Sequence, residues 1–241
     1  MVGPMMETTT HKIVIHGPGG YEKLRMEQHP TVQPGPGEVL VQSEAGGVNY
    51  ADVAVRWGLY ESAKKYVGWP ITPGFEYAGT VVQVGPGVKN WKMGDRVFGI
   101  TRFGAYSTHI VVPEHQLFAI PKSFTAEQAA GFPAVFMTAY HALFQHVVTR
   151  PGMTVLIHSA AGGVGTALLQ LCRIAGMKTV GVVGSSHKVE TALKFGATHV
   201  IDKSTEDLWA KADEYAPEGF DLILDANGFE TLKKGYTRLK P

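Results

Sequence analysis

The sequence predicts an α/β protein made of two domains: a mostly β domain over residues 1–124 and a domain with a doubly wound parallel sheet over residues 125–241. Two observations predict this division. Up to residue 124, short runs of β-branched residues are separated by turns rich in glycine and proline. After that point, expected strands and helices alternate strictly, and such alternation builds a parallel sheet.

The first domain is expected to consist mainly of short strands. Its turns are marked by the glycine- and proline-containing segments 34–37, 85–87 and 93–95. The expected strands cover residues 12–15, 38–42, 79–84, 96–99 and 109–112.

The second domain is expected to open with one helix over about residues 126–144. The expected strands that follow cover residues 153–159, 179–183, 198–202 and 220–225, and the expected helices cover residues 165–175, 187–195 and 205–215. The single cysteine, Cys172, lies on the apolar face of the first of these later helices, so we expect it to be buried and inert.

A glycine turn between the first strand and helix of this series predicts a diphosphate site. Residues 155–166 read VLIHSAAGGVGT, a buried strand that enters a glycine turn and opens into a helix. Helix N-termini bind anions, and glycine lets phosphates approach the backbone. The spacing departs from the usual G-x-G-x-x-G because position 168 is Leu. A structural alternative is that Gly162 supplies a positive φ angle. The candidate binding residues are Ser159, Gly162, Gly163, Val164 and Gly165.

The end of the next strand indicates which dinucleotide binds. An NAD-preferring site places Asp or Glu about 20 residues past the turn, on the ribose 2′-hydroxyl. This chain has no acid there and offers hydroxyls and an ammonium group, which suit the 2′-phosphate of NADPH. The alternative is a serine pair that caps a helix beside a solvated lysine. The candidates are Gly184, Ser185, Ser186 and Lys188, with Lys203 at the end of the following strand.

Composition excludes several classes of protein. The 241 residues are 44% hydrophobic and 18% charged, as in ordinary globular proteins. The net charge of +1 does not indicate binding to nucleic acid or to an anionic membrane. The first eight residues lack the features of a signal peptide, and no apolar run approaches the length of a membrane span. We therefore expect a cytoplasmic protein without a transmembrane segment.

Several motifs in order resemble a known family. Segments 47–52 (GVNYAD), 73–79 (PGFEYAG), 94–97 (GDRV), 132–133, 137–140 and 158–165 together resemble the zinc-free medium-chain dehydrogenases/reductases, in the quinone oxidoreductase branch. Segments 196–202, 234–236 and 239–241 resemble the members of the synaptic vesicle membrane protein VAT-1 type. The resemblance implies a GroES-like β-barrel domain followed by a Rossmann domain, with NADPH between them.

Zinc is not expected. A zinc site needs several thiolate, imidazole or carboxylate ligands on one tetrahedral centre. By the resemblance, Asn49 takes the place of the first cysteine ligand of zinc-dependent relatives, and Phe75-Glu76 replaces their His-Glu pair. A single cysteine also cannot form a four-cysteine structural lobe.

The resemblance places Asn49 and Tyr50 at the reacting end of the cofactor. Asn49 would lie at the nicotinamide, while the Tyr50 hydroxyl, with Asp52 behind it, would donate to the substrate oxygen. The alternative is a turn stabilised by Asn49 and Asp52, with Tyr50 packed between the domains. Thr138 lies where family members touch the cofactor; a purely structural helix is the other interpretation.

These observations predict NADPH-dependent, zinc-independent reduction of quinones or other α,β-unsaturated carbonyl compounds. The second hypothesis is a non-catalytic NADPH-binding protein with a regulatory or vesicle-trafficking role. A usual domain of this kind has six parallel strands, whereas we count four, so we expect the chain to be incomplete relative to its family. For the complete protein we expect a homodimer.

Overall fold

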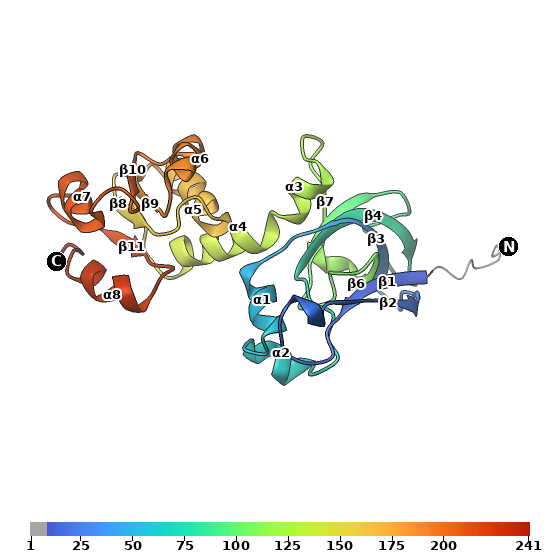
Figure 1. Cartoon of the computed structure of the whole chain (residues 1–241). Helices are drawn as coiled ribbons and strands as arrows, with labels where there is room; N and C mark the ends of the chain where they lie inside the picture. Colours follow the sequence, from blue (N-terminus) through green and yellow to red (C-terminus); the bar gives the residue numbers. More distant parts are fainter. Residues whose placement is uncertain (1–8) are drawn as a thin grey trace. The chain divides into compact units, whose positions relative to one another are not determined.

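The computed structural model describes residues 9–241, which form two compact units that divide after Ala134 (Figure 1). The sequence placed the border earlier, after residue 124. The units divide later because helix α3 (Ala126–Ala130) packs its alanines against Ala78 and Phe98 of the N-terminal unit. The first eight residues, for which no signal peptide is expected, lie outside the described part of the chain.

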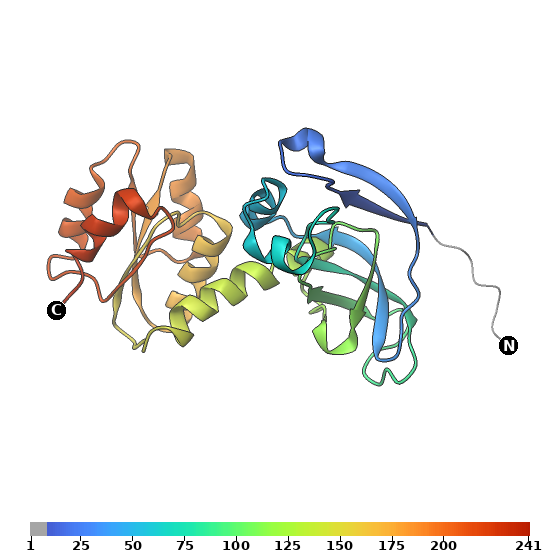
Figure 2. The same ribbon diagram turned by 90° about the horizontal axis from the view of Figure 1, so that it is seen from below.

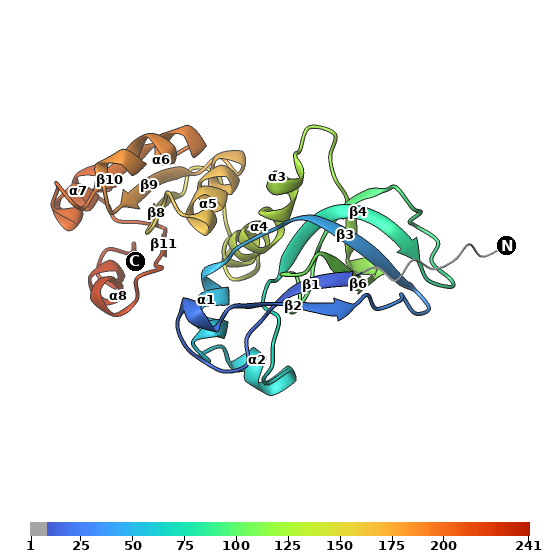
Figure 3. The ribbon, with the colours of Figure 1, turned by 45° about the vertical axis from the view of Figure 1, so that its right-hand side comes forward.

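The N-terminal unit is built on a five-stranded antiparallel sheet in the order β6-β3-β4-β5-β7. Strands β1 and β2 pair separately as a hairpin (Figure 3). Its inner face buries Val39, Val41, Tyr77 and Val97. The strands are β1 (Thr9–Val14), β2 (Arg25–Pro30), β3 (Glu38–Gly46), β4 (Glu76–Val84), β5 (Arg96–Ile100), β6 (His109–Pro113) and β7 (Leu117–Ala119), and the helices before α3 are α1 (Tyr50–Arg56) and α2 (Glu61–Tyr66).

The C-terminal unit is a parallel sheet of four strands in the order β10-β9-β8-β11. Figure 2 shows helices on both sides of this sheet. The strands are β8 (Thr154–Ile157), β9 (Lys178–Val183), β10 (His199–Asp202) and β11 (Leu222–Leu224), and the helices are α5 (Gly163–Ile174), α6 (Val189–Phe195), α7 (Leu208–Tyr215) and α8 (Phe229–Tyr236).

Alternation along β8 divides the core of this unit between the two faces of the sheet. Val155 and Ile157 pack with residues of α5, including Cys172, whereas Leu156 packs with Ala212 of α7. Successive side chains of a strand point to opposite faces, so one strand supplies both layers. The prediction that Cys172 is buried is confirmed, and burial raises the pKa of its thiol to about 12.

The helix expected over residues 126–144 is wrong as a single element. The structure has α3, then α4 (Pro133–Tyr140), then a π-helical turn (His141–Gln145). Gly131 ends α3, and Pro133 is the first residue of α4, where its fixed φ and missing N–H are tolerated.

The four strands predicted for the C-terminal unit are confirmed, with ends that differ by one to a few residues. Helix α8, and in the other unit β2, β7, α1 and α2, were not predicted as elements. Among residues 9–241, no helix has the length and apolar character that crossing a membrane requires.

Candidate functional site

The carboxyl ends of β8 and β11 form the first candidate site. β9 and β10 lie on one side of β8 and β11 lies on the other, so the chain crosses the sheet in opposite directions from β8. In open parallel sheets, ligands bind outside the carboxyl ends of the strands at this point of reversal. The glycine turn follows β8 directly.

The turn presents a helix N-terminus to this crevice. Ser159 adopts a positive φ of 53°, and Gly162 donates its N–H to the Ser159 carbonyl oxygen (2.9 Å). Gly162 is the N-cap of α5, which begins at Gly163. The N–H groups of a first helical turn have no intrahelical acceptor, so they can bind an anion.

The glycines of the turn have different roles. A Cβ on Gly165 would lie 2.3 Å from the Ser159 carbonyl oxygen and 2.7 Å from Ala160 Cα, so this glycine permits close packing of α5 on the turn. A Cβ on Gly162 would lie 3.2 Å from the same oxygen. The φ of Gly162 is −81°, so the alternative that Gly162 supplies a positive φ is wrong.

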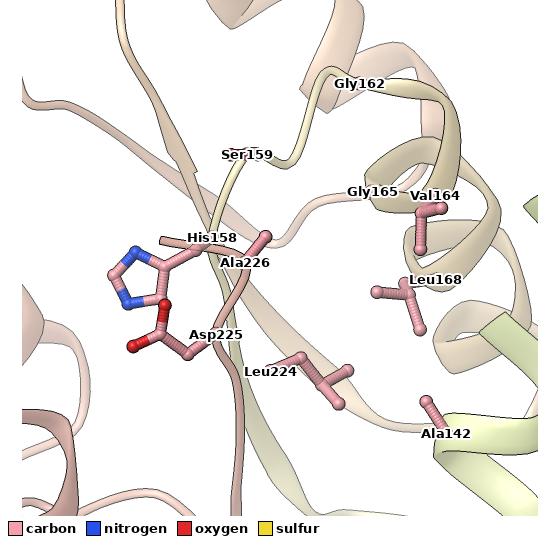
Figure 4. A pocket seen from close by; sticks show the side chains of 10 residues that line it. All are labelled: Ala142, His158, Ser159, Gly162, Val164, Gly165, Leu168, Leu224, Asp225 and Ala226. Atoms are coloured by element: carbon pink, nitrogen blue, oxygen red, sulfur yellow. The ribbon is translucent and has the colours of Figure 1, made fainter. Parts of the chain in front are cut away.

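One cavity of about 250 Å³ lies along this turn. Figure 4 shows the side chains of Val164, Leu168 and Leu224 together on one side of the β8 end, with Ala142 of the π-helical turn beside them. The cavity is also lined by His158, Ser159, Gly162, Gly165, Asp225 and Ala226.

A second cavity of about 210 Å³ joins the glycine turn to the two predicted lysines. Among the described residues that line it, Lys188 and Lys203 are the charged ones and none is acidic. The lining residues are Ser159, Ala161, Gly162, Val182, Val183, Gly184, Lys188, Lys203 and Asn227. The glycine turn and two ammonium groups therefore line the same cavity.

Four other candidates do not line these cavities: Gly163, Ser185, Ser186 and Thr138. Ser186 instead donates its hydroxyl to Asp202 Oδ2 (2.5 Å), and this hydrogen bond lowers the pKa of that carboxyl. Ser185 precedes the short turn Ser186–Lys188 without a side-chain capping hydrogen bond. Thr138 is exposed on α4.

Sequence reasoning missed a polar cluster at the ends of β8 and β11. His158 is 2% exposed, its Nδ1 lies 3.2 Å from the Asn227 side-chain amide nitrogen, and its Nε2 has no hydrogen-bond partner. Burial lowers the pKa of His158, which favours the neutral ring. Asp225 accepts hydrogen bonds from the Asn227 and Gly228 N–H groups. The signal was available, because both residues directly follow strands of the parallel sheet.

The second candidate site lies in the N-terminal unit around Asp52, which is 7% exposed. Its carboxylate accepts hydrogen bonds from the Asn49 N–H (2.8 Å), the Gly74 N–H (3.0 Å) and the Tyr106 hydroxyl (2.9 Å). Asp52 was expected behind the Tyr50 hydroxyl; the tyrosine that it binds is Tyr106. Tyr50 is 79% exposed at the start of α1.

Glu76 fixes the side chain of Asn49. It is 1% exposed, and its carboxylate accepts the Asn49 Nδ2–H (2.8 Å) and the Ala134 N–H (2.7 Å). Burial raises the pKa of Glu76, against the lowering effect of these two hydrogen bonds, and Asp52 adds to the rise. Gly47 leaves room for this carboxylate, since a Cβ there would lie 2.2 Å from Glu76 Oε1.

Within residues 9–241, no three His, Cys, Asp or Glu side chains are grouped so that they could hold a metal ion.

Two family models match the chain. The Alcohol dehydrogenase GroES-like domain matches residues 35–122, and the Zinc-binding dehydrogenase matches residues 163–241. The N-terminal unit is thus GroES-like, and the C-terminal unit is part of a Rossmann-like fold.

Curated relatives agree with these matches. The synaptic vesicle membrane protein VAT-1 homolog of Rattus norvegicus is 42% identical over 95% of this chain and 56% of its own length. The 2-haloacrylate reductase of Burkholderia sp is 37% identical over 95% of this chain and 69% of its own length. The chain spans little more than half the length of the VAT-1 relative.

Solved structures show the same fold. The quinone oxidoreductase of Pseudomonas syringae pv. tomato DC3000 has a TM-score of 0.87 and 34% identity, over 96% of this chain and 71% of its own. The Escherichia coli quinone oxidoreductase, solved in complex with NADPH, has a TM-score of 0.87 and 33% identity, over 97% of this chain and 70% of its own. The chain therefore belongs to the medium-chain dehydrogenase/reductase family and is of its quinone oxidoreductase type.

Proposed function

We propose that this chain binds NADPH in its C-terminal unit and belongs to a reductase of quinones or other α,β-unsaturated carbonyl compounds. The observation that carries the proposal is the cavity in which Lys188 and Lys203 lie with the glycine turn and no acidic side chain. A carboxylate there would suit the free 2′-hydroxyl of NADH, whereas two ammonium groups suit a 2′-phosphate.

The residues present fit the rest of the nucleotide. The first turn of α5 offers backbone N–H groups to a diphosphate, and Gly162 keeps the approach to them free of a side chain. The apolar side chains of Val164, Leu168 and Leu224 line the neighbouring cavity, which suits the less polar parts of a dinucleotide. NADPH, when bound, supplies a hydride to an electrophilic carbon.

For the N-terminal unit we propose that Asn49 and Tyr50 serve the substrate. Glu76 accepts one amide hydrogen of Asn49, which fixes the amide and leaves its other hydrogen for a ligand. The exposed Tyr50 hydroxyl would donate a hydrogen bond to the substrate oxygen as negative charge develops there. Reduction of this kind needs no zinc. Cytoplasmic location, a homodimeric complete protein and small-molecule partners without nucleic acid complete the proposal.

A second function is supported by the 42% identity with the VAT-1 homolog. In that case the chain binds NADPH for regulation or vesicle trafficking and does not turn over substrate. Both functions share the cofactor site, so NADPH binding alone does not distinguish them.

The test is titration of the purified 241-residue chain with NADPH, followed by NADPH consumption with a panel of quinones and enones. Gly162→Val is the control, because its φ suits valine while the branched side chain would obstruct the anion site. Binding and turnover, both lost in Gly162→Val, support the reductase. Binding without turnover on the whole panel, in the complete protein as well as in the 241-residue chain, supports the regulatory function. Normal binding by Gly162→Val would contradict the cofactor site itself.

A further inference from the structure

Two histidines of the π-helical turn converge at the surface. In an α-helix, residues five apart differ by about 140° around the axis and face different directions. The π turn at His141–Gln145 is wider, and it brings His146 beside His141. The two rings meet edge to face, with centroids 4.3 Å apart, and their Nε2 atoms are separated by 2.8 Å.

Gln145 sets the tautomer of His141. Its side-chain oxygen Oε1 contacts His141 Nδ1. An amide oxygen only accepts hydrogen bonds, so Nδ1 carries the hydrogen and Nε2 of His141 keeps a lone pair. His146 Nε2 then donates to it. A histidine that binds a metal through one ring nitrogen usually donates the N–H of the other nitrogen to an oxygen, which orients the ring.

The separation of the two Nε2 atoms suits one metal ion. With metal–nitrogen distances of about 2.0–2.1 Å, two ligands of a tetrahedral zinc ion lie about 3.3 Å apart, so the pair would open by roughly half an ångström. Both side chains are exposed, which leaves room for this movement and for entry of the ion. Imidazole ligands suit Zn²⁺, Ni²⁺ and Cu²⁺ in preference to Mg²⁺ or Ca²⁺.

We propose that His141 and His146 form a two-imidazole site for a late first-row divalent metal ion, with Gln145 as the residue that positions His141. No further His, Cys, Asp or Glu in residues 9–241 is grouped with them as a metal site, so solvent would complete the coordination. The site does not depend on the proposed reductase activity and uses none of its residues.

The experiment is calorimetric titration of the tag-free chain with ZnCl₂. We expect one site per chain, whose affinity falls at least about tenfold in His141→Ala and in His146→Ala, because either change leaves a single imidazole. Gln145→Ala should weaken binding about tenfold, the low end of the effect of losing an orienting partner. The matched control is His115→Ala, which removes an exposed histidine of the short turn Glu114–Gln116 and should leave zinc binding unchanged.

The same titration with MgCl₂ should give no binding at this site. Circular dichroism would confirm that the variants remain folded, as expected for exposed positions. The proposal is overturned if the parent chain binds no zinc, if both histidine variants bind it as the parent does, or if His115→Ala loses as much affinity as they do.

Discussion

The glycine-turn site and the Asp52–Glu76 cluster differ in how the chain assembles them. The first is drawn mainly from one short stretch, in which strand, turn and helix follow one another, so its geometry is set locally. The second joins Asn49 and Asp52 to Gly74, Glu76 and Tyr106, which approach only when the sheet forms. Local sites can be inferred from sequence spacing, whereas partners across a sheet cannot.

The largest effect should come from removing the buried carboxylate of the second cluster. Asp52→Ala leaves the N–H groups of Asn49 and Gly74 and the Tyr106 hydroxyl without an acceptor, and each unsatisfied group costs about 1–3 kcal/mol. We expect the free energy of unfolding to fall by about 4 kcal/mol, measured by urea unfolding. Asp95→Ala, which removes an exposed acceptor, should cost about 1 kcal/mol. If the free energy of unfolding fell equally in Asp52→Ala and Asp95→Ala, the hydrogen bonds of Asp52 would not stabilise the N-terminal unit.

The glycine turn offers a comparison between two neighbouring positions. Gly165→Ala forces backbone atoms apart, because its Cβ would lie 2.3 Å from the Ser159 carbonyl oxygen. We expect a loss of about 2–3 kcal/mol. Gly162→Ala meets the same oxygen at 3.2 Å with an ordinary φ, so it should cost less than about 1 kcal/mol. Thermal unfolding of both variants checks this order, and the reverse order would contradict the packing described for α5.

Tyr50 tests the substrate role proposed for the N-terminal unit. If its hydroxyl stabilises charge on the substrate, Tyr50→Phe in the complete, active protein should lower kcat/KM on quinones about 100-fold. NADPH affinity and Tm should not change, since the side chain is 79% exposed. Unchanged kinetics would mean that water supplies the proton. Loss of stability with unchanged kinetics would instead assign Tyr50 a packing role.

A smaller, pH-dependent effect is expected from Glu76. Because burial raises its pKa in the folded state, the folded protein binds this proton more tightly than the unfolded chain does. Stability from this group is therefore full below the ordinary glutamate pKa of about 4.3 and declines as pH rises through the raised value. As pH rises, the Tm of the parent should therefore fall relative to the Tm of Glu76→Gln. A rise in the Tm of the parent relative to Glu76→Gln would mean that the hydrogen bonds from Asn49 and Ala134 outweigh burial in setting the pKa of Glu76.

Much of the C-terminal unit could be predicted from sequence because its strands are apolar and its helices amphipathic. The two strands that were missed lack such signals. β2 reads RMEQHP, with charged residues and a terminal proline, and β7 has three residues. Helix α1 carried a signal, because Asn49 and Asp52 have the spacing of a capping box, but a turn stabilised by the same two residues also fits the segment.

The candidate sites divide in the same way. Ser159, Gly162 and the two lysines line one cavity as the βαβ pattern predicts, since parallel strands bring their carboxyl ends together. Ser186 was predicted from the same pattern, but its hydroxyl donates to Asp202 at the end of the neighbouring strand β10. The pairing of Asp52 with Tyr106 joins residues 54 positions apart, and no spacing rule reaches that far.

We propose that the cavity beside the glycine turn recognises the 2′-phosphate through Lys188 and Lys203. The most direct measurement compares the Kd values of NADPH and NADH, by quenching of tryptophan fluorescence, in the parent chain and in the Lys188→Ala/Lys203→Ala double variant. A charge-assisted hydrogen bond contributes about 1.5–3 kcal/mol, so the parent should bind NADPH about 10- to 100-fold more tightly than NADH. The double variant should lose that preference while its affinity for NADH stays the same. Equal affinity of the parent for the two nucleotides would rule out this recognition of the 2′-phosphate.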